Sequence, residues 1–147
     1  MDVLKKNLLE ERLNKSPIPL FLHDSTIENL VTYGEQLIIS YRLGMYHYGT
    51  NMDVFKDVIN ESDKRILIVR QIFDGVKIKE FKLSIEDIGV DILGIDNILM
   101  IDKNIIRFEI FNENVVGYQS KVTDPVVEFE FKGFKWEVIG EEECKYW

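Results

Sequence analysis

The chain has 147 residues, of which 46% are hydrophobic and 12% aromatic, and this composition predicts one folded domain, residues 1–147, rather than a disordered chain. Its 26 acidic side chains outnumber the 18 basic ones and give a net charge of −8. This balance argues against binding to the phosphate backbone of nucleic acids, and it permits attraction to a basic protein partner.

The N-terminal segment, residues 1–15, carries leucines about four positions apart, as on one stripe of a short helix: Leu4, Leu8, Leu9 and Leu13. Charged residues lie among them, so the segment is not a secretory signal. Ser16-Pro17 should end the helix, because the residue before a proline avoids the helical region. We predict a surface helix that closes an open edge or face of a sheet; a helix that docks onto a partner is the alternative.

Residues 23–43 predict a strand, a tight reversal and a second strand, since apolar residues alternate with more polar ones on both sides of Gly34. A two-residue loop, Gly34-Glu35, would suit a type II′ turn but would place the apolar groups of the two strands on opposite faces. A three-residue loop, 34–36, pairs Val31 with Ile39 and gathers these groups on one face. We predict the three-residue loop.

A glycine-flanked segment, residues 44–51, follows this second strand and contains Tyr46, His47 and Tyr48. Glycines at both ends predict a loop, and the polar tips of these rings tolerate partial exposure. We predict that the three residues bind a partner. The alternative is that one of the tyrosines covers the end of the core.

The middle of the chain predicts several further strands. Residues 52–60 fit either a helix, which we favour, or a strand. Residues 66–69 are apolar on both faces, which indicates a central strand covered on two sides. This strand continues to Phe73, where Asp74-Gly75 predicts a hairpin that returns through residues 76–83. Strands are also predicted at 98–101 and 105–111, with a polar turn at 102–104 between them.

Near the C-terminus, two apolar alternations flank Lys132-Gly133: Val127, Phe129 and Phe131 before it, and Phe134, Trp136 and Val138 after it. A two-residue type I′ turn at Lys132-Gly133 would place all six side chains on one face, and we predict this hairpin. A bulge at Gly133 within one continuous strand is the alternative. Residues 141–147 form an acidic tail that we expect to fray.

The sequence lacks the motifs of phosphate-binding loops, serine hydrolases and zinc proteases. Two histidines, His23 and His47, do not supply the three protein ligands of a catalytic zinc site, and the lone Cys144 excludes an intrachain disulfide. No apolar run approaches the roughly 20 residues that span a bilayer. We therefore predict no catalytic residues, metal, cofactor or membrane contact, and a cytoplasmic location.

These elements predict a mainly β fold, either an antiparallel sandwich or a strongly curled sheet, with a short N-terminal helix. The oligomeric state and the strand order beyond neighbouring hairpins do not follow from the pattern.

Two short segments carry a resemblance: residues 22–27, Leu-His-Asp-Ser-Thr-Ile, and residues 34–39, Gly-Glu-Gln-Leu-Ile-Ile. They resemble the N-terminal half of a loose group of small bacterial proteins that begin with His-Asp-Ser or His-Asp-Ala before a first hairpin. Many of these are uncharacterised, and some are regarded as immunity proteins of polymorphic toxin systems. The similarity covers residues 22–43, with a weaker echo at 66–76.

This resemblance implies a non-enzymatic, cytoplasmic β-rich protein that works by binding another protein. A basic, toxin-like partner would match the net charge of −8. The alternative function, suggested by the many aromatic residues, is a small-ligand binder in which the sheet curves into a half-open β-barrel around a pocket.

Overall fold

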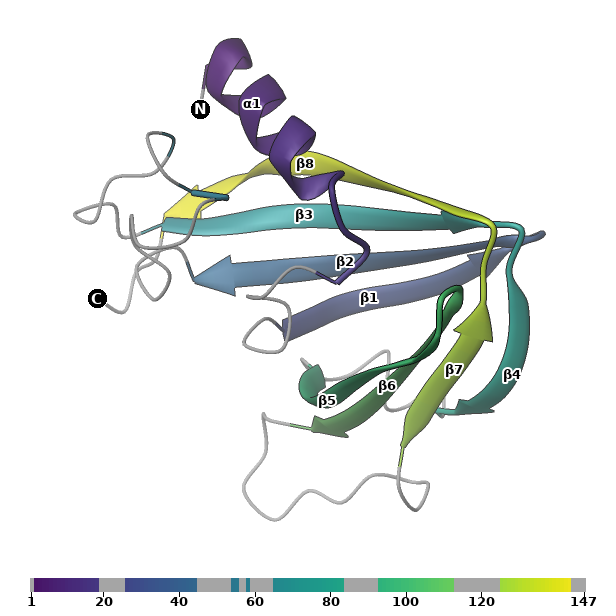
Figure 1. The fold of residues 1–147 in the computed structure, drawn as a ribbon. Helices are drawn as coiled ribbons and strands as arrows, with labels where there is room; N and C mark the ends of the chain where they lie inside the picture. The colour runs from purple at the N-terminus through teal and green to yellow at the C-terminus, as the bar shows by residue number, and fades with distance from the viewer. Residues whose placement is uncertain are drawn as a thin grey trace.

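A computed structural model describes residues 2–18, 26–44, 54–55, 58, 65–83, 93–112 and 125–143. The described elements are α1 (Val3–Leu13), β1 (Thr26–Tyr33), β2 (Gln36–Gly44), β3 (Arg65–Asp74), β4 (Lys77–Lys82), β5 (Leu93–Asp102), β6 (Ile105–Asn112), β7 (Val126–Glu130) and β8 (Gly133–Glu143). The predicted class, mainly antiparallel β with a short N-terminal helix, is confirmed (Figure 1).

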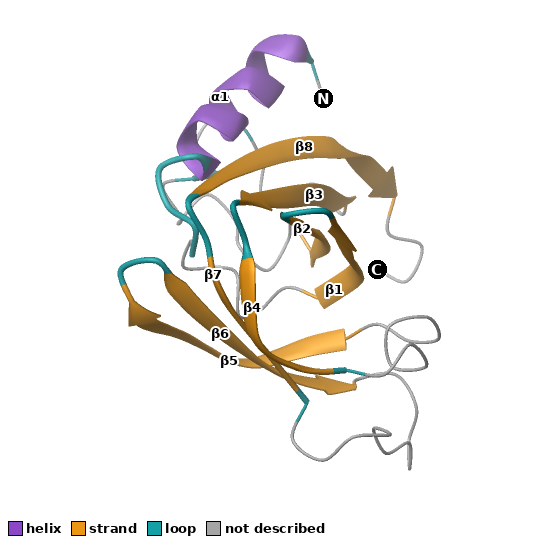
Figure 2. Ribbon diagram, turned by 90° about the vertical axis from the view of Figure 1, so that its right-hand side faces the viewer, coloured by secondary structure: helices purple, strands orange, loops and turns teal. Residues whose placement is uncertain are grey.

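The strands follow the order β4-β7-β6-β5-β1-β2-β3-β8 in one antiparallel, hydrogen-bonded series. At its centre, β1 and β5 share two residue pairs, Thr26 with Gly94 and Ile27 with Leu93. The sheet folds at this narrow junction, so that a first half (β1, β2, β3, β8) faces a second half (β4, β5, β6, β7), as Figure 2 shows. The architecture is therefore one curled sheet whose halves lie in two layers.

The chain passes between the halves at two adjacent corners. β3 pairs with β8 as far as Asp74 and Gly133, and β4 then pairs with β7 from Lys77 and Glu130 onward. The backbone N–H of Lys132 donates to the carbonyl of Asp74 at 2.8 Å and ties the two corners together. The two strand pairs thus form one long ribbon that bends from the first half into the second.

Both hairpins predicted at these corners are wrong. β3 and β4, on either side of Asp74-Gly75, do not pair with each other: β3 pairs with β8, and β4 pairs with β7. β7 and β8, on either side of Lys132-Gly133, do not pair with each other either, since β7 pairs with β4 and β6. The alternative, a bulge at Gly133 within one continuous strand, is not observed either, because β7 ends at Glu130, β8 begins at Gly133, and the chain bends between them into the other half. The predicted burial is nevertheless right for five of the six side chains, Val127, Phe129, Phe131, Trp136 and Val138, whereas Phe134 is only partly buried.

Gly75 is needed at its corner for two reasons. Its φ of +62° lies in the left-handed region that glycine adopts without strain. A Cβ at this position would also lie 2.7–2.8 Å from three side-chain carbons of Lys132. Here the Asp-Gly pair occurs where the chain passes close to another segment. The same two residues are also typical of a hairpin turn, so their composition does not distinguish the two arrangements.

Substitution of Gly75 and of Gly34 by alanine separates these two effects. Gly34 has a similar φ, +59°, but nothing lies within 4 Å of its Cβ position. Gly34→Ala should lower the free energy of unfolding by about 1–2 kcal/mol, the cost of a left-handed non-glycine residue. Gly75→Ala should cost more, because Lys132 must also move. Urea titrations measure both losses, and equal losses would contradict the close approach at Gly75.

The β1–β2 hairpin forms, but with a two-residue loop. Tyr33 pairs with Gln36, and Val31 pairs with Ile38. The predicted three-residue loop is therefore wrong. Val31 and Tyr33 project away from the core and are 44% and 76% exposed.

A bulge in β1 restores the apolar match that the two-residue loop would otherwise lose. The register shifts between Ile27 and Asn29, so Glu28 is the additional residue. Because a bulge changes which face the following residues occupy, both Ile27 and Leu30 are buried together with the inward side chains of β2. The prediction failed because it assumed one unbroken alternation along β1.

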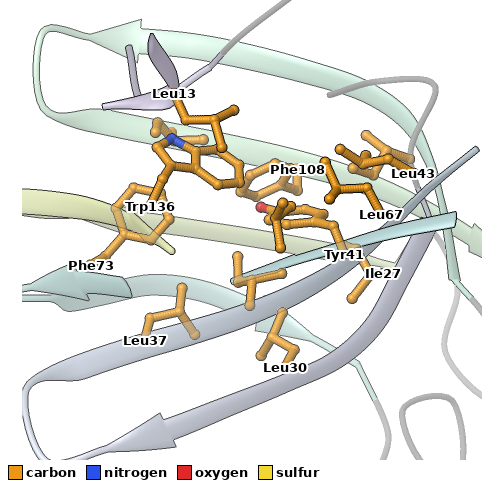
Figure 3. Close-up of a cluster of buried hydrophobic side chains, with 14 of the residues drawn as sticks. Leu13, Ile27, Leu30, Leu37, Tyr41, Leu43, Leu67, Phe73, Phe108 and Trp136 are labelled. Atoms are coloured by element: carbon orange, nitrogen blue, oxygen red, sulfur yellow. The ribbon is translucent and has the colours of Figure 1, made fainter. Parts of the chain in front are cut away.

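Large aromatic side chains fill the space between the halves. Trp136, Tyr41, Phe73, Phe108 and Phe129 are all fully buried. The rings of Phe73 on β3 and Phe129 on β7 meet edge to face with centroids 4.7 Å apart, and Phe131 lies 5.1 Å from Phe73. Such contacts join the first half to the second. Figure 3 shows Phe73 of the first half and Phe108 of the second in one buried cluster.

α1 packs against β8 through the C-terminal part of its predicted apolar stripe. Asp2 caps the helix, since its carboxylate accepts the backbone N–H of Lys5 at 2.8 Å. Leu9 and Leu13 are fully buried, whereas Leu4 is 81% and Leu8 36% exposed. The predicted stripe is therefore buried only over the last turns of the helix.

Side chains of α1 and of its C-cap residue, Asn14, also bind the backbone of β8, which is an edge strand. The amide of Asn14 donates to the carbonyl of Trp136 at 3.1 Å and accepts the N–H of Trp136 at 2.7 Å. A carboxylate oxygen of Glu10 accepts the N–H of Val138 at 2.9 Å. The prediction that the helix closes an open edge of the sheet is confirmed.

The remaining predictions are confirmed in part. β5 and β6 confirm the strands predicted on either side of the turn at 102–104. Within residues 52–60 the structure describes Val54, Phe55 and Val58, all at turn positions, and the choice between helix and strand lies otherwise outside the described residues. β8 continues to Glu143, so residues 141–143 of the predicted tail belong to a strand, and 144–147 lie outside the described residues.

Candidate interaction surfaces

The predicted partner-binding residues Tyr46, His47 and Tyr48 lie outside the described residues, as do His23 and Cys144. They remain a prediction. In the chain they come after Met45, which follows Gly44, the last residue of β2; Gly44 pairs with Ile66 of β3.

Apolar side chains project outward from the first half of the sheet, on the face opposite the core. Val31 of β1 pairs with Ile38 of β2, which in turn pairs with Ile72 of β3, so the three form a row across the strands. β3 adds two more outward isoleucines, which alternate with buried residues. We call these side chains the outer apolar patch: Val31, Ile38, Ile66, Ile68 and Ile72.

The outer apolar patch keeps part of its surface in solvent. Val31 is 44% exposed and the four isoleucines are half-buried. β3 lies between β2 and β8, so the predicted central strand is confirmed. The prediction that both faces of this strand are covered is wrong for the outer face. Only the face toward the core, with Leu67 and Val69, is fully buried. Exposed apolar side chains that adjoin one another are typical of binding surfaces.

Ion pairs hold two arginines, Arg42 and Arg70, on the same face of the sheet as the patch. Arg42 on β2 donates to Glu28 at 3.3 Å and to Glu142 at 2.8 Å. Arg70 on β3 binds Glu137 of β8 through its guanidinium. These pairs combine strands of the first half. Arg70 lies opposite Ser40 and between Ile68 and Ile72 on β3, so a polar, charge-balanced band separates the row of Val31, Ile38 and Ile72 from Ile66 and Ile68.

The hydrogen bond from Arg70, together with Lys135 at 3.4 Å, holds the pKa of Glu137 below its ordinary value of 4.5. A carboxyl whose pKa is lower in the folded state contributes stability above its unfolded pKa, and this contribution is lost as the pH falls through the folded pKa. Below about pH 4.5 the parent should therefore lose stability, and Glu137→Gln should lose less over the same interval. Urea unfolding midpoints between pH 6 and 3 measure this slope. Equal slopes for parent and variant would contradict the role of Glu137.

A second ion-pair cluster joins three strands of the second half. Arg107 on β6 binds Glu80 of β4 at 3.1 Å and Glu128 of β7 at 3.2 Å, and Lys82 binds Glu80 at 3.1 Å. Hydrogen bonds from Arg107 and Lys82 lower the pKa of Glu80. A carboxylate held in this way stays ionised at neutral pH and is a poor proton donor. The cluster links β4 to its neighbours.

The core contains one polar side chain that the sequence did not single out. Gln71 on β3 is fully buried; its carbonyl oxygen accepts the hydroxyl of Tyr41 at 2.8 Å, and its amide donates to the carbonyl of Pro17 at 2.7 Å. Burial raises the pKa of Tyr41 well above its ordinary value, so the phenol stays protonated. The indole N–H of Trp136 donates to the carbonyl of Ser16 at 3.0 Å. These bonds fasten the segment after α1 to the core.

Gln71 could have been identified in the sequence as a buried polar residue, because it lies between the inward residues Val69 and Phe73 at the spacing of alternate residues on β3. Alternation along a strand assigns it to the buried face, and a buried amide needs partners.

Within the described residues, no group of three or more His, Cys, Asp or Glu side chains could hold a metal ion. In the same part of the chain, no helix has the length and apolar character needed to cross a membrane. A scan against protein-family models and searches of curated proteins and of solved structures found no match to this chain.

Proposed function

We propose that the protein is a non-enzymatic, cytoplasmic interaction module of the immunity type, which binds a basic protein through the outer apolar patch. The observation that carries this proposal is the patch itself, a row of three outward aliphatic side chains with two further isoleucines of β3, on the first half of the sheet. Exposed aliphatic side chains beside polar, ion-paired groups offer both apolar and polar contact, and protein interfaces use both. The resemblance of residues 22–43 to small bacterial immunity proteins supports the same function.

The distribution of charge favours a basic partner. Acidic residues outnumber basic ones by 26 to 18 in the whole chain, whereas the described residues carry the two signs in nearly equal numbers. The acidic excess therefore belongs to the connecting segments; residues 84–92, for example, contain Glu86, Asp87 and Asp91 and no basic residue. Such an excess speeds the encounter with a basic protein and leaves the patch to supply apolar contact.

Tyr46, His47 and Tyr48 are the further residues that we propose to contact the partner, on the basis of the sequence. In the chain they come two residues after Gly44, the end of β2, whose outward side chains include Ile38 and the paired Arg42. Tyrosine is among the residues enriched at protein interfaces, because it combines a large apolar ring with a polar tip.

The packing of the described aromatic side chains favours this function over a ligand-binding half-open barrel. The aromatic residues that suggested a pocket contact one another, as Phe73 and Phe129 do at 4.7 Å. An unbiased thermal-shift screen of small molecules tests the ligand-binding alternative, which requires a reproducible hit.

Affinity purification of the tagged protein from its native host tests the proposal. We expect one basic protein in stoichiometric amount, with recovery that falls as the salt concentration rises. Ile72→Lys places a positive charge in the patch and should reduce recovery at least about tenfold, the equivalent of 1.4 kcal/mol. Ile101→Lys, at an outlying position that is 53% exposed, is the matched control and should retain the partner. Recovery of the protein alone, or of a partner that Ile72→Lys does not affect, would contradict the proposal.

A further inference from the structure

The edge of β8 is covered by side chains, although its backbone is arranged for another strand. Along an antiparallel strand, the N–H and C=O groups of alternate residues point to opposite sides. Those of Trp136 point away from β3, because both are bound by the side-chain amide of Asn14. The N–H of Val138 points to the same side and is bound by Glu10.

We propose that α1 is a removable cap, and that the β8 edge beneath it pairs with the β8 edge of a second copy of this chain. Asn14 offers Trp136 one donor and one acceptor, which is what a residue on a neighbouring antiparallel strand would offer. When α1 moves away, another strand can satisfy the same groups. This inference is independent of the proposed partner, because it concerns the edge of the first half and not its outer face.

The charges on β8 favour a second copy as the occupant. In antiparallel pairing about a twofold axis at Trp136, each Trp136 lies opposite its own copy and exchanges both backbone bonds with it. The same register places Lys135 of one copy opposite Glu137 of the other, on both sides of the axis. Opposite charges at directly facing positions stabilise a strand pair. Phe134 then lies opposite Val138, whose outward N–H has the required direction.

Undocking of α1 exposes Leu9 and Leu13, so the docked helix is the stable state of the parent chain, and the helix remains tethered when it opens. Leu9 and Leu13 anchor the helix, while Val3 and Leu4 near its start are 71% and 81% exposed. Beyond the helix, the carbonyl of Pro17 is held by the buried amide of Gln71. The segment around Pro17 can therefore remain in place while the helix leaves the edge.

The full-length double variant Glu10→Ala/Asn14→Ala tests this inference. It removes the three side-chain bonds to β8, which should shift the docking equilibrium of α1 by about 100-fold toward the open state. In sedimentation velocity over a range of concentrations, we expect a dimerisation step that the parent lacks. Far-UV circular dichroism and tryptophan fluorescence establish that the variant is folded. If it is not, Asn14→Asp, which keeps the acceptor for Trp136 and loses the donor, should show a smaller increase in dimer.

The register supplies the decisive control. Adding Lys135→Glu to the double variant places like charges opposite each other and should weaken the dimer at least about tenfold. Adding Lys103→Glu instead, in the exposed β5–β6 turn, is the matched charge change and should leave the dimer intact. A folded variant that shows no added dimerisation would overturn the proposal, and so would a dimer that Lys135→Glu does not weaken.

Discussion

Trp136→Ala is expected to lower the free energy of unfolding by about 3–5 kcal/mol, the usual cost of truncating a large buried aromatic side chain. Trp136 is fully buried, and its ring lies 5.5 Å from that of Tyr41. Its indole N–H also binds the carbonyl of Ser16, so the substitution removes an apolar contact and leaves an acceptor without this donor. Guanidinium titration followed by circular dichroism measures the loss.

Trp136→Phe is the matched control for this substitution. It keeps an aromatic ring in the cluster drawn in Figure 3 and loses the N–H donor, so it should cost less than Trp136→Ala. A loss below about 1 kcal/mol for Trp136→Ala would contradict the placement of this side chain in the core.

Phe129→Ala is expected to cost a similar amount, about 3–5 kcal/mol, because Phe129 connects the two halves of the sheet. Its ring meets Phe73 of β3 at 4.7 Å and Phe108 of β6 at 6.2 Å. Phe81→Ala on the edge strand β4 is the matched control; this phenylalanine is 38% exposed and should cost clearly less.

A double-mutant cycle isolates the contact between the halves. Phe73→Ala and Phe129→Ala, measured singly and together, should show a coupling of about 0.5–1.5 kcal/mol beyond additivity. A coupling near zero would mean that β3 and β7 do not meet across the core.

Alternation in the sequence identified the strands and most of the core, because each strand has one buried face. β2 is the clearest case: Leu37, Ile39, Tyr41 and Leu43 are all fully buried, as their spacing predicts. The same reasoning correctly placed Phe129 and Trp136 in the interior.

The errors arose where a local signal is compatible with two long-range arrangements. Asp74-Gly75 and Lys132-Gly133 have the composition of hairpin turns, yet each marks a corner where the chain passes between the halves. The distinction depends on pairing between segments about sixty residues apart in the sequence, which turn chemistry does not encode. The loop after Tyr33 was mispredicted because the bulge at Glu28 leaves no clear mark in composition.

The candidate surface was only partly visible in the sequence. The apolar run at residues 66–69 indicated apolar side chains on both faces of the strand. The prediction took both faces as buried, whereas the outer side chains are partly exposed. The row of Val31, Ile38 and Ile72 depends on register across three strands, and the β8 contacts of Glu10 and Asn14 depend on where the helix docks. Neither follows from one segment alone.

The most direct test of the proposed function is an isoleucine methyl NMR spectrum of the full chain, recorded with and without the basic protein recovered from its host. We predict that the methyl signals of Ile38, Ile66, Ile68 and Ile72 shift on binding, while that of Ile101 does not. Unchanged signals from the outer apolar patch in a saturated complex would contradict it.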